Sequence, residues 1–378
     1  MRPRSEMVIL IYEFCINVGV ATLSRQKRSR QLRSEFDTST EPEKRDLTVK
    51  RFALLTVFVL FLTVTVRPTQ AWNYAGHRII AAIAWDQLTP ERRMELVQLL
   101  KQHPRFEQDF QSRMPQIIKD ATPEIQARWL FMRAATWPDI ARSFKDADRE
   151  KYHHGTWHYI NQPIYLDEAS KNALSKQLSA NVATSIKAGD DVLGFNIIQA
   201  LEYCVAQLKD PRVSQADKAV YFCWVMHLVG DSHQPLHSSA LFSRRMFPEG
   251  DRGGNDIRIA KSNLHSQWDG LLGNSFKDSE IVGQAVGIER DPANKRLGES
   301  AARDLNYVTW INESHELARE KGYSEEILEA ARVSEAEGGK FQKLSSLPQS
   351  YYRQAGSIAV KRAAQAGWRL AAVLESMR

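Results

Sequence analysis

The chain has 378 residues and a formal net charge of +6. Residues 1–71 carry 12 Lys and Arg against 7 Asp and Glu, which leaves the remainder with a net charge of about +1. A net charge this small is no evidence for binding of nucleic acid through a broad basic face. The three cysteines are too few for a scaffold built on disulfides.

The start of the chain has the pattern of a leader. Residues 52–66 form an apolar run of 15 that follows two basic residues. That pattern is typical of a secretory signal peptide, and the run is short for a membrane span of about 20 residues. Small residues at the third and first positions before Trp72 suit a peptidase. We therefore predict a signal peptide over residues 50–71 and a secreted or periplasmic protein that begins at Trp72. An uncleaved membrane anchor is the alternative.

Residues 1–49 are basic and polar, and signal peptides are not normally preceded by such a tail. A start codon assigned too far upstream, with translation beginning near Val49, is one interpretation. A disordered upstream extension is the other. Residues 72–378 are sufficient for one large domain with a substantial core.

Helical periodicity dominates after Trp72. Residues 76–88 have apolar side chains at i, i+3 and i+4, and residues 89–102 follow with Thr89 as N-cap and Pro90 at the first helical position. Further helical patterns cover residues 124–135, 170–188, 194–208, 214–230, 294–319 and 348–376. Strand signals are few, although residues 253–260 could form one arm of a hairpin. The sequence predicts an all-α fold, a single mostly helical domain with a short β-hairpin.

Histidines and aspartates recur at helical spacing. His227 and Asp231 are four residues apart, and so are His265 and Asp269, so each pair lies on one helix face. His237 follows the proline that ends the first of these helices. Taken alone, such a pair is more often an ordinary polar contact than a metal site.

Considered together, the motifs indicate a metal site. Asp139 and His158 lie upstream, His77 comes five residues after Trp72, and cleavage before Trp72 would create a free α-amine there. Imidazole nitrogens and carboxylate oxygens are ligand types that zinc accepts, in sites of about four ligands. The nine candidate residues are too many for one zinc ion. They fit two or three ions, with a carboxylate bridging a close pair.

On these motifs the sequence resembles the trinuclear-zinc single-strand nucleases, the family of mung-bean nuclease, whose members also act as 3′-nucleotidases. The segments "WNYAGH", "GDSHQPLH" and "GGN" and the two HxxxD pairs carry the resemblance, which runs from Trp72 to the C-terminal helix. The family's mostly helical fold is shared with the zinc phospholipases C. The resemblance implies three Zn²⁺ ions as cofactors. The implied ligands are Trp72, His77 and Asp231 for one ion, Asp139, His158, His227 and Asp231 for its close neighbour, and His237, His265 and Asp269 for the third.

The resemblance also implies an activity. We expect a secreted zinc-dependent phosphodiesterase that cuts single-stranded DNA or RNA endonucleolytically, leaves 5′-phosphates and has 3′-nucleotidase activity. Close zinc ions would activate a water and stabilise charge on the phosphate. Asp139 would orient the nucleophile, and Arg142 matches a family position whose planar guanidinium contacts the phosphoryl oxygens. No stable protein partner is implied, and no membrane association after the leader is removed.

Two residues are candidates for binding the base. Tyr159 follows His158 and could stack on an unpaired base, with core packing as the alternative. Asn161 stands where the fungal and plant members are expected to have an aspartate that binds the base. Because an amide both donates and accepts hydrogen bonds, we expect a broader or different base preference.

Two other functions compete with the nuclease. In the zinc phospholipases C the histidine lies roughly twice as far from the N-terminal tryptophan, and the last carboxylate is a glutamate. Here the spacing from Trp72 to His77 is five, and Asp269 is the last carboxylate, so both features favour the nuclease. A non-catalytic secreted zinc protein is the second alternative. Asp139 and Arg142 argue against it, because a binding protein would not require them.

Five histidines are not among the candidate ligands. His103 and His315 have no partner motif, and we expect them on helix surfaces. His233 lies inside a motif but between ligand positions, so we expect it behind the metal ligands at most, and we expect the loop residues His153 and His154 to face solvent. After cleavage of the leader only Cys204 and Cys223 remain. Export permits a disulfide between them, and two buried free thiols are the alternative.

Overall fold

The computed structural model describes residues 72–377, so the predicted leader and the tail before it lie outside the described residues. Sixteen α-helices and two short strand pairs make up this part of the chain. The predicted all-α class is therefore confirmed. Within these residues, every helix is too short or too polar to traverse a bilayer.

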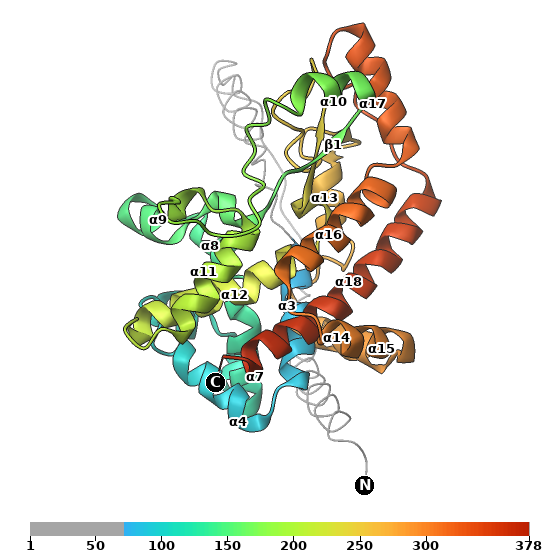
Figure 1. The fold of residues 1–378 in the computed structure, drawn as a ribbon. Helices are drawn as coiled ribbons and strands as arrows, with labels where there is room; N and C mark the ends of the chain where they lie inside the picture. Colours follow the sequence, from blue (N-terminus) through green and yellow to red (C-terminus); the bar gives the residue numbers. More distant parts are fainter. Residues whose placement is uncertain (1–71, 378) are drawn as a thin grey trace, which may run out of the picture. The chain divides into compact units, whose positions relative to one another are not determined.

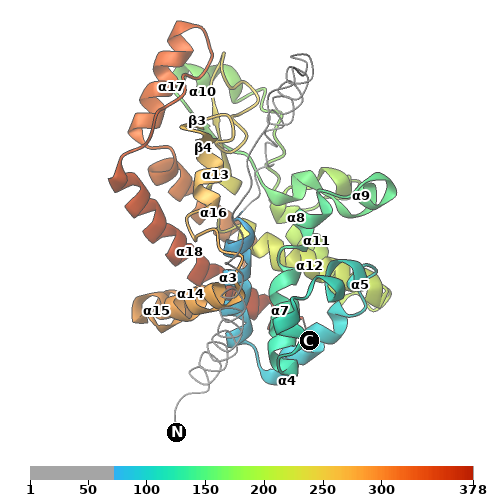
Figure 2. The ribbon, with the colours of Figure 1, turned by 180° about the vertical axis from the view of Figure 1, so that it is seen from behind.

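Three helices form the centre of the fold (Figures 1 and 2). They are α3 (Tyr74–Gln87), α12 (Gln215–Asp231) and α18 (Gln349–Glu375). The long helix α18 packs against both α3 and α12. Its Gly367 allows the close approach, since a Cβ there would lie 2.4 Å from Ile83 Cγ2 of α3. Every residue of α12 from Phe222 to Asp231 is buried, so the second half of this helix is enclosed on all sides. Polar residues in its last turns are consequently carried into the interior.

Helices on either side enclose this centre. The ones that contact α12 or α3 are α4 (Pro90–Leu100), α7 (Pro123–Ala134), α8 (Trp137–Ala141), α11 (Ile197–Lys209) and α14 (Asp278–Arg290). Thr89 caps α4 as predicted, with its Oγ1 accepting from Arg92 N at 3.2 Å. The remaining short elements here are α5 (Phe106–Asp109), α6 (Gln116–Lys119), α9 (Asp146–Tyr152), α15 (Pro292–Ala301) and the 3₁₀ helices η1 (Gln111–Arg113), η2 (Gly155–His158) and η3 (Val192–Gly194).

A second apolar cluster lies away from α4 and α7, toward the end of the fold that carries β1, α10 and α17 (Figures 1 and 2). Helical elements that contribute to it are η4 (Pro235–His237), α13 (Leu264–Asp269), the π-helical η5 (Ala318–Gly322), α17 (Glu325–Glu337) and the start of α18. Helices α10 (Glu168–Leu174) and α16 (Tyr307–Leu317) belong to the same part of the chain. Leu264 and Trp268 of α13 are buried in this cluster. Trp268 Nε1 also donates to Tyr351 Oη of α18 at 2.8 Å. These contacts fix the orientation of α13.

The strands form two separate pairs. The predicted hairpin is confirmed as β3 (Arg258–Ile259) and β4 (Ser262–Asn263), which run antiparallel. The other pair was not predicted: β1 (Gln162–Tyr165) and β2 (Ser239–Phe242) run parallel, with Gln162 opposite Ser239. Its strands come from distant parts of the chain, and each begins shortly after a predicted ligand.

Two helical predictions were wrong in part. The pattern over residues 170–188 ends at Leu174, and no residue from 171 to 190 is buried. A helix without an apolar face to bury gains little from packing. The pattern over residues 294–319 contains a break between α15 and α16. Helices α14 and α17 were missed, and α14 contains two glycines, which have low helix propensity.

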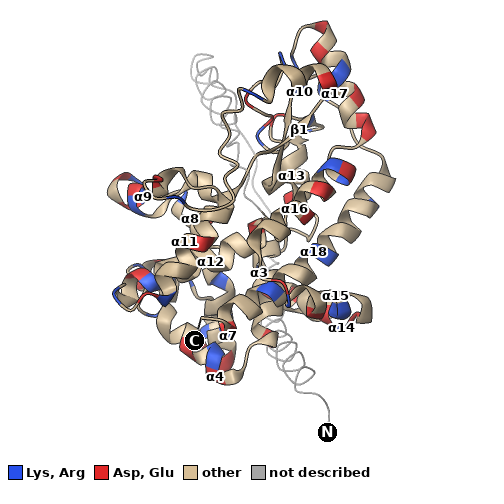
Figure 3. Ribbon diagram, viewed as in Figure 1, with Lys and Arg blue, Asp and Glu red and all other residues tan. Residues whose placement is uncertain are grey.

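The outer helices carry charges of both signs, as the small net charge of residues 72–378 indicates. Acidic and basic residues stand side by side on outer helices such as α9, α15 and α17 (Figure 3).

Cys204 and Cys223 are both buried and free. The alternative of two buried thiols is therefore confirmed, and burial raises the pKa of both.

Candidate metal centre

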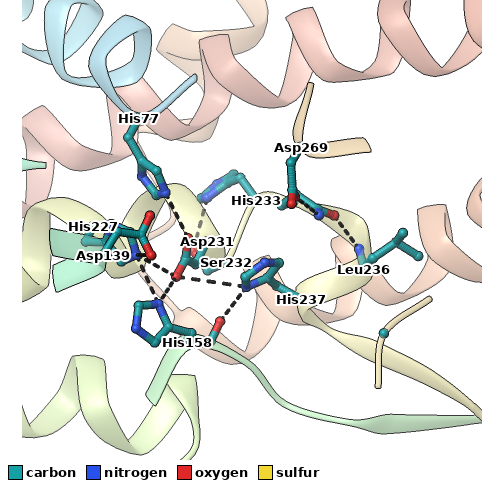
Figure 4. Close-up of polar contacts among 12 residues, drawn as sticks. His77, Asp139, His158, His227, Asp231, Ser232, His233, Leu236, His237 and Asp269 are labelled. Carbon is teal, nitrogen blue, oxygen red and sulfur yellow. Dashed lines mark hydrogen bonds and ion pairs between the residues drawn. The ribbon is translucent and has the colours of Figure 1, made fainter. Parts of the chain in front are cut away.

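Asp231 lies at the centre of the predicted ligands (Figure 4). Its Oδ1 is 3.2 Å from His77 Nε2. Its Oδ2 is 3.0 Å from His158 Nδ1 and 3.1 Å from His227 Nε2. The carboxylate is fully buried. Its two oxygens therefore face different histidines, Oδ1 toward His77 and Oδ2 toward His158 and His227.

The crossing of α3 and α12 brings these residues together. His77 lies in the first turn of α3, and its ring stacks on His227 of α12 with centroids 4.0 Å apart. Gly230, just before Asp231, makes room for it, because a Cβ there would lie 2.7 Å from His77 Nδ1. Asp139, on the short helix α8, reaches the same place with Oδ1 at 4.0 Å from His227 Nε2.

Three of the histidines are fixed by main-chain carbonyls. His227 Nδ1 lies 2.8 Å from Ala135 O, and His237 Nδ1 lies 2.6 Å from His158 O. His265 Nδ1 lies 2.7 Å from Gly253 O. A carbonyl oxygen only accepts, so each Nδ1 must carry the proton and each Nε2 of a neutral ring must carry a lone pair. Metal-binding histidines are characteristically held in this way.

The lone pairs of His237 and His265 face each other, with Nε2 atoms 3.1 Å apart. Two lone pairs at this distance repel unless a cation lies against both. Burial lowers the pKa of His265 to about 3, so a proton is held poorly. Asp269 completes the group, with Oδ2 at 3.7 Å from His265 Nε2, and Gln234 Nε2 donates to its Oδ1 at 2.8 Å. The donor set therefore suits a metal ion.

Buried polar atoms without a hydrogen-bond partner gather in this region. They are both ring nitrogens of His77, His158 Nε2, Asp139 Oδ1, Asp231 Oδ1 and Asp269 Oδ2. Such atoms are rare in folded proteins, and coordination would satisfy those that face an ion. Among the described residues, three groups have ligand atoms that all lie within 4.8 Å of one another. The groups are His77, His227 and Asp231; Asp139, His158 and His227; and His237, His265 and Asp269.

The first two groups differ from the predicted ligand sets in the use of His227. This residue takes part in both groups, whereas the predicted sets used it once. Burial disfavours the charged form of His227, but the carboxylates of Asp231 and Asp139 outweigh burial and raise its pKa. Burial works against ionised Asp231 as well, but His227 and His237 hold the pKa of Asp231 well below its usual range.

The start of the described chain is anchored beside α13. Trp72 is fully buried, and Asn73 N donates to Asp269 O at 3.2 Å. Asn73 Oδ1 caps α3 by accepting from Ala75 N at 3.0 Å. A Cβ at Gly76 would lie 2.9 Å from Trp72 Cβ, so glycine permits this packing.

The predicted substrate-contacting residues lie at the edge of the buried centre. Arg142 Nη2 is 3.4 Å from Asp139 Oδ1, and the Arg142 side chain is 25% exposed. Tyr159 is 39% exposed, so the alternative of core packing is wrong. Asn161 is half-buried just before β1.

A buried carboxylate that the motifs did not indicate, Asp251, supports His265. Asp251 Oδ2 accepts from Gly254 N at 3.0 Å, and its Oδ1 accepts from Leu241 N and Tyr323 Oη, each at 2.9 Å. These bonds hold the loop whose Gly253 carbonyl orients His265. Gly253 has φ +62°, and a Cβ there would lie 2.4 Å from Leu236 O. The glycine pair after Asp251 was the available signal, because positive φ favours glycine.

Three histidines outside the ligand groups have structural contacts. His233 Nδ1 donates to Val229 O at 2.8 Å, and its Nε2 accepts from Arg369 Nη1 at 3.0 Å. The helix-surface prediction for His103 was wrong, because its ring is buried with its centroid 4.4 Å from that of Trp137. His315 is half-buried, with Nδ1 at 2.8 Å from Ser239 Oγ.

The fold and the site together define a mostly helical protein with a buried histidine and aspartate centre that could hold metal ions. The family model described as S1/P1 Nuclease matches residues 72–378, and the chain belongs to this family. The resemblance seen in the motifs is thereby confirmed. Membership makes the protein a nuclease, a hydrolase of phosphodiester bonds in nucleic acid.

Relatives from Arabidopsis thaliana are similar at low identity. Endonuclease 2 is 24% identical over 330 residues, which cover 85% of this chain and 94% of the relative. Endonuclease 1 is 22% identical over 333 residues, covering 85% of this chain and 92% of the relative. Endonuclease 4 is 22% identical over 218 residues, covering 57% of this chain and 59% of the relative.

Proposed function

We propose that the protein is a zinc-dependent endonuclease with three Zn²⁺ ions that cuts single-stranded DNA or RNA to 5′-phosphate products and also acts as a 3′-nucleotidase. The facing Nε2 lone pairs of His237 and His265, 3.1 Å apart with Asp269 beside them, carry this proposal. A cation is needed against both of these nitrogens, and a proton binds there poorly because burial lowers the pKa of His265. The names of the Arabidopsis relatives support endonucleolytic cleavage.

The proposed ligands are the sets that the sequence implied, and these share most of their members with the three buried groups. His77, Asp231 and the amine of Trp72 would hold one ion. The residues Asp139, His158, His227 and Asp231 would hold its neighbour, and His237, His265 and Asp269 would hold the third. Nitrogen and carboxylate donors of this kind suit zinc. Bound zinc would supply Lewis-acid activation of water and neutralise charge on the phosphate.

The chain's own groups would orient the substrate. The Arg142 guanidinium, held beside Asp139, presents a planar fork that matches two phosphoryl oxygens. Its partial exposure leaves it reachable from solvent. The exposed ring of Tyr159 would stack on a base, which must be unpaired to reach it. Asn161 would then bond the base edge as donor and acceptor.

Maturation would create one of the ligands. We propose that residues 50–71 act as a signal peptide, that residues 1–49 lie upstream of it, and that the mature enzyme, residues 72–378, is exported. Cleavage before Trp72 would turn an amide nitrogen, a poor ligand, into an amine. The anchoring of Asn73 on Asp269 supports a chain start that lies beside the metal centre.

The test is a digest of single-stranded DNA and of 3′-nucleotides by protein that begins at Trp72, with products located by mass spectrometry. We expect 5′-phosphate ends and release of 3′-phosphate, both lost on chelation and restored by zinc. If fully zinc-loaded protein leaves the DNA intact, the proposal is wrong. A phospholipid assay on the same preparation would then test for a phospholipase C.

A further inference from the structure

A cavity of about 470 Å³ adjoins the metal centre and shares Asp139 with it. Three arginines line it: Arg105, Arg113 and Arg133. We call this cavity the arginine pocket. Its other walls include the rings of Tyr74 and Phe144. No residue of the arginine pocket other than Asp139 belongs to the proposed metal ligands.

The three arginines are not equally compensated. Arg105 pairs with Asp109, at 2.8 Å from Nε to Oδ2, and with Asp148. Arg133 and Arg113 instead direct Nε to the main-chain carbonyls of Asp109 and Gln108. Within residues 72–377, no carboxylate lies within ion-pair distance of either guanidinium.

This arrangement leaves two positive charges facing one space. Arg113 is exposed, whereas Arg133 is half-buried. Burial lowers the pKa of Arg133, with the Arg78 and Arg113 charges acting in the same direction and the Asp109 carboxylate in the opposite one. Removing a cation from water is costly unless an anion accompanies it. The acidic residues on the pocket wall are Asp109 and Asp139. Asp109 pairs with Arg105, and metal ions would balance the charge of Asp139. Arg113 and Arg133 therefore have no carboxylate paired with them, and a phosphate has oxygens that suit their guanidinium forks.

Aromatic rings beside the pocket favour a nucleic acid over a free anion. The Tyr74 ring packs on Phe276 with centroids 5.0 Å apart, and Phe276 is 69% exposed. Exposed aromatic faces next to phosphate-binding arginines are the combination that binds single strands. Tyr74 also lies in the first turn of α3, three residues before His77. Tyr74 thus lines the pocket and shares a helix with the proposed ligand His77.

We propose that the arginine pocket binds a second phosphate of the single-stranded substrate, next to the phosphate at the metal centre, through Arg113 and Arg133. This inference rests on the proposed nuclease function and specifies its substrate. It makes a polynucleotide a better substrate than a 3′-mononucleotide, because a mononucleotide has no second phosphate to place there.

The test compares zinc-loaded Arg113→Ala with Arg296→Ala, which removes an exposed arginine from α15. Both variants lose one positive charge at the surface. For each, kcat/KM is measured on a single-stranded oligonucleotide and on a 3′-mononucleotide. We expect the ratio of the two values to fall about ten-fold in Arg113→Ala, a typical loss for a charged hydrogen bond, and to stay at the wild-type level in Arg296→Ala. An unchanged ratio in Arg113→Ala would overturn the inference.

Salt dependence gives a second readout that does not depend on turnover. A labelled phosphorothioate oligonucleotide keeps its charges and resists cleavage, so its binding can be followed by anisotropy. The slope of log affinity against log salt should become shallower by about 0.7 in Arg113→Ala, the loss of one single-strand phosphate contact. Arg113→Lys, which keeps the charge, should restore the slope. A wild-type slope in Arg113→Ala would count against the pocket.

Free phosphate is the other source of the same chemistry. If Arg113→Ala relieves inhibition by inorganic phosphate but leaves the substrate ratio and salt slope at wild-type values, the pocket binds free phosphate and the inference is wrong. Failure of the proposed function is distinguishable. In that case the wild-type protein itself would hydrolyse neither substrate, whereas failure of the inference leaves an active enzyme indifferent to Arg113.

Discussion

The side chains of Asp139 and Arg142 meet at the boundary between the buried ligands and solvent. Arg142 Nη2 lies 3.4 Å from Asp139 Oδ1, and the arginine retains 25% of its exposure. The guanidinium is therefore held beside a proposed metal ligand and is still reachable from solvent.

For Arg142→Ala we expect turnover of single-stranded DNA to fall about 10²- to 10³-fold, the usual cost of one lost charge-stabilising donor. Zinc content, measured by atomic absorption, should change little. Arg142→Lys should recover only part of the activity, because an ammonium lacks the planar fork. A loss of zinc in proportion to activity would instead assign Arg142 to holding Asp139 in place.

The amine of Trp72 can be tested by adding one glycine before it. The extension replaces the amine with an amide, so we expect lower zinc content after dialysis and a large loss of turnover. The matched control is the same protein beginning at Trp72. Full zinc and full turnover in the extended protein would exclude the amine as a ligand.

His103 should make stability depend on pH. Burial lowers its pKa to about 3, below the value of about 6.5 for an unfolded chain. Between these values the unfolded state binds more protons, so stability is fully present above pH 6.5 and is lost as the pH falls toward 3. The slope is at most about 1.4 kcal/mol per pH unit.

The measurement is urea unfolding of wild type and His103→Asn at pH 7 and pH 5. In the wild type, Arg105 N donates to His103 Nδ1 at 3.1 Å. The asparagine side chain keeps an acceptor for this N–H. Wild type should lose more free energy of unfolding than the variant over this range. Equal losses would show that His103 is free to protonate in the native state.

Among the elements, the parallel pair of β1 and β2 connects two ligands. His158 ends η2 just before β1, and His237 ends η4 just before β2. Ile160 N donates to His237 O at 2.8 Å, while His237 Nδ1 donates to His158 O at 2.6 Å. The two chain segments thus exchange hydrogen bonds at the position where both histidines enter the metal centre.

Helix α18 is tied to the same region by a buried charge network. Glu313 of α16 accepts from Arg362 and Arg369 of α18, each with an N to Oε2 distance of 2.6 Å. Both arginines are 2% exposed. Arg369 also donates to His233, and Arg362 donates to the main-chain oxygen of His233. The network therefore fixes the turn that follows Asp231.

Replacing Glu313 by alanine would leave two buried guanidiniums without their counter-ion. We expect the free energy of unfolding to fall by about 3–5 kcal/mol, the range for breaking a buried pair. Glu299→Ala is the matched control, because its pair with Lys295 lies on the surface of α15, where such pairs contribute about 0–1 kcal/mol. Chemical denaturation measures both. A loss in Glu313→Ala no larger than in the control would show that the arginines are stabilised by other groups.

Across the whole molecule, the metal centre joins segments that are far apart in sequence. Its ligand groups come from α3, α8, η2, α12, η4 and α13. Ions bound there would cross-link the packed helices. Bound ions at 1,000 times their dissociation constant stabilise the folded state by about 4 kcal/mol per site.

Removal of the metal should therefore lower the melting temperature. A loss of about 4 kcal/mol corresponds to roughly 6 °C in a chain of this size. Scanning calorimetry before and after chelation measures the change, and added zinc should restore the original transition. An identical melting temperature with and without chelator would show that the centre folds without ions.

Much of the fold could be predicted from local patterns. Helices α7, α11, α12 and α18 begin and end within a few residues of the predicted ranges. Their signals are local: Thr122 and Ser214 cap α7 and α12, and apolar residues recur at helical spacing. The HxxxD pairs are local too, because i and i+4 share a face in any helix. The donor types of the proposed centre were therefore visible in the sequence.

The rest depended on contacts between distant residues. The stacking of His77 on His227, the pairing of β1 with β2 and the burial of His103 all join segments separated by many residues. The helical pattern over 170–188 failed for the same reason, because no partner surface buries it. The arginine pocket likewise draws its residues from α3, α5, η1, α7 and α8.

By itself, the sequence determined which side chains are available for chemistry and which stretches can form a helix, since both depend on neighbours within about one turn. Only the tertiary structure decided which of those side chains meet, which histidine nitrogens are left with lone pairs, and which arginines lack a counter-ion. These outcomes depend on packing free energy and on the exclusion of water between distant segments, and neither is encoded in local spacing.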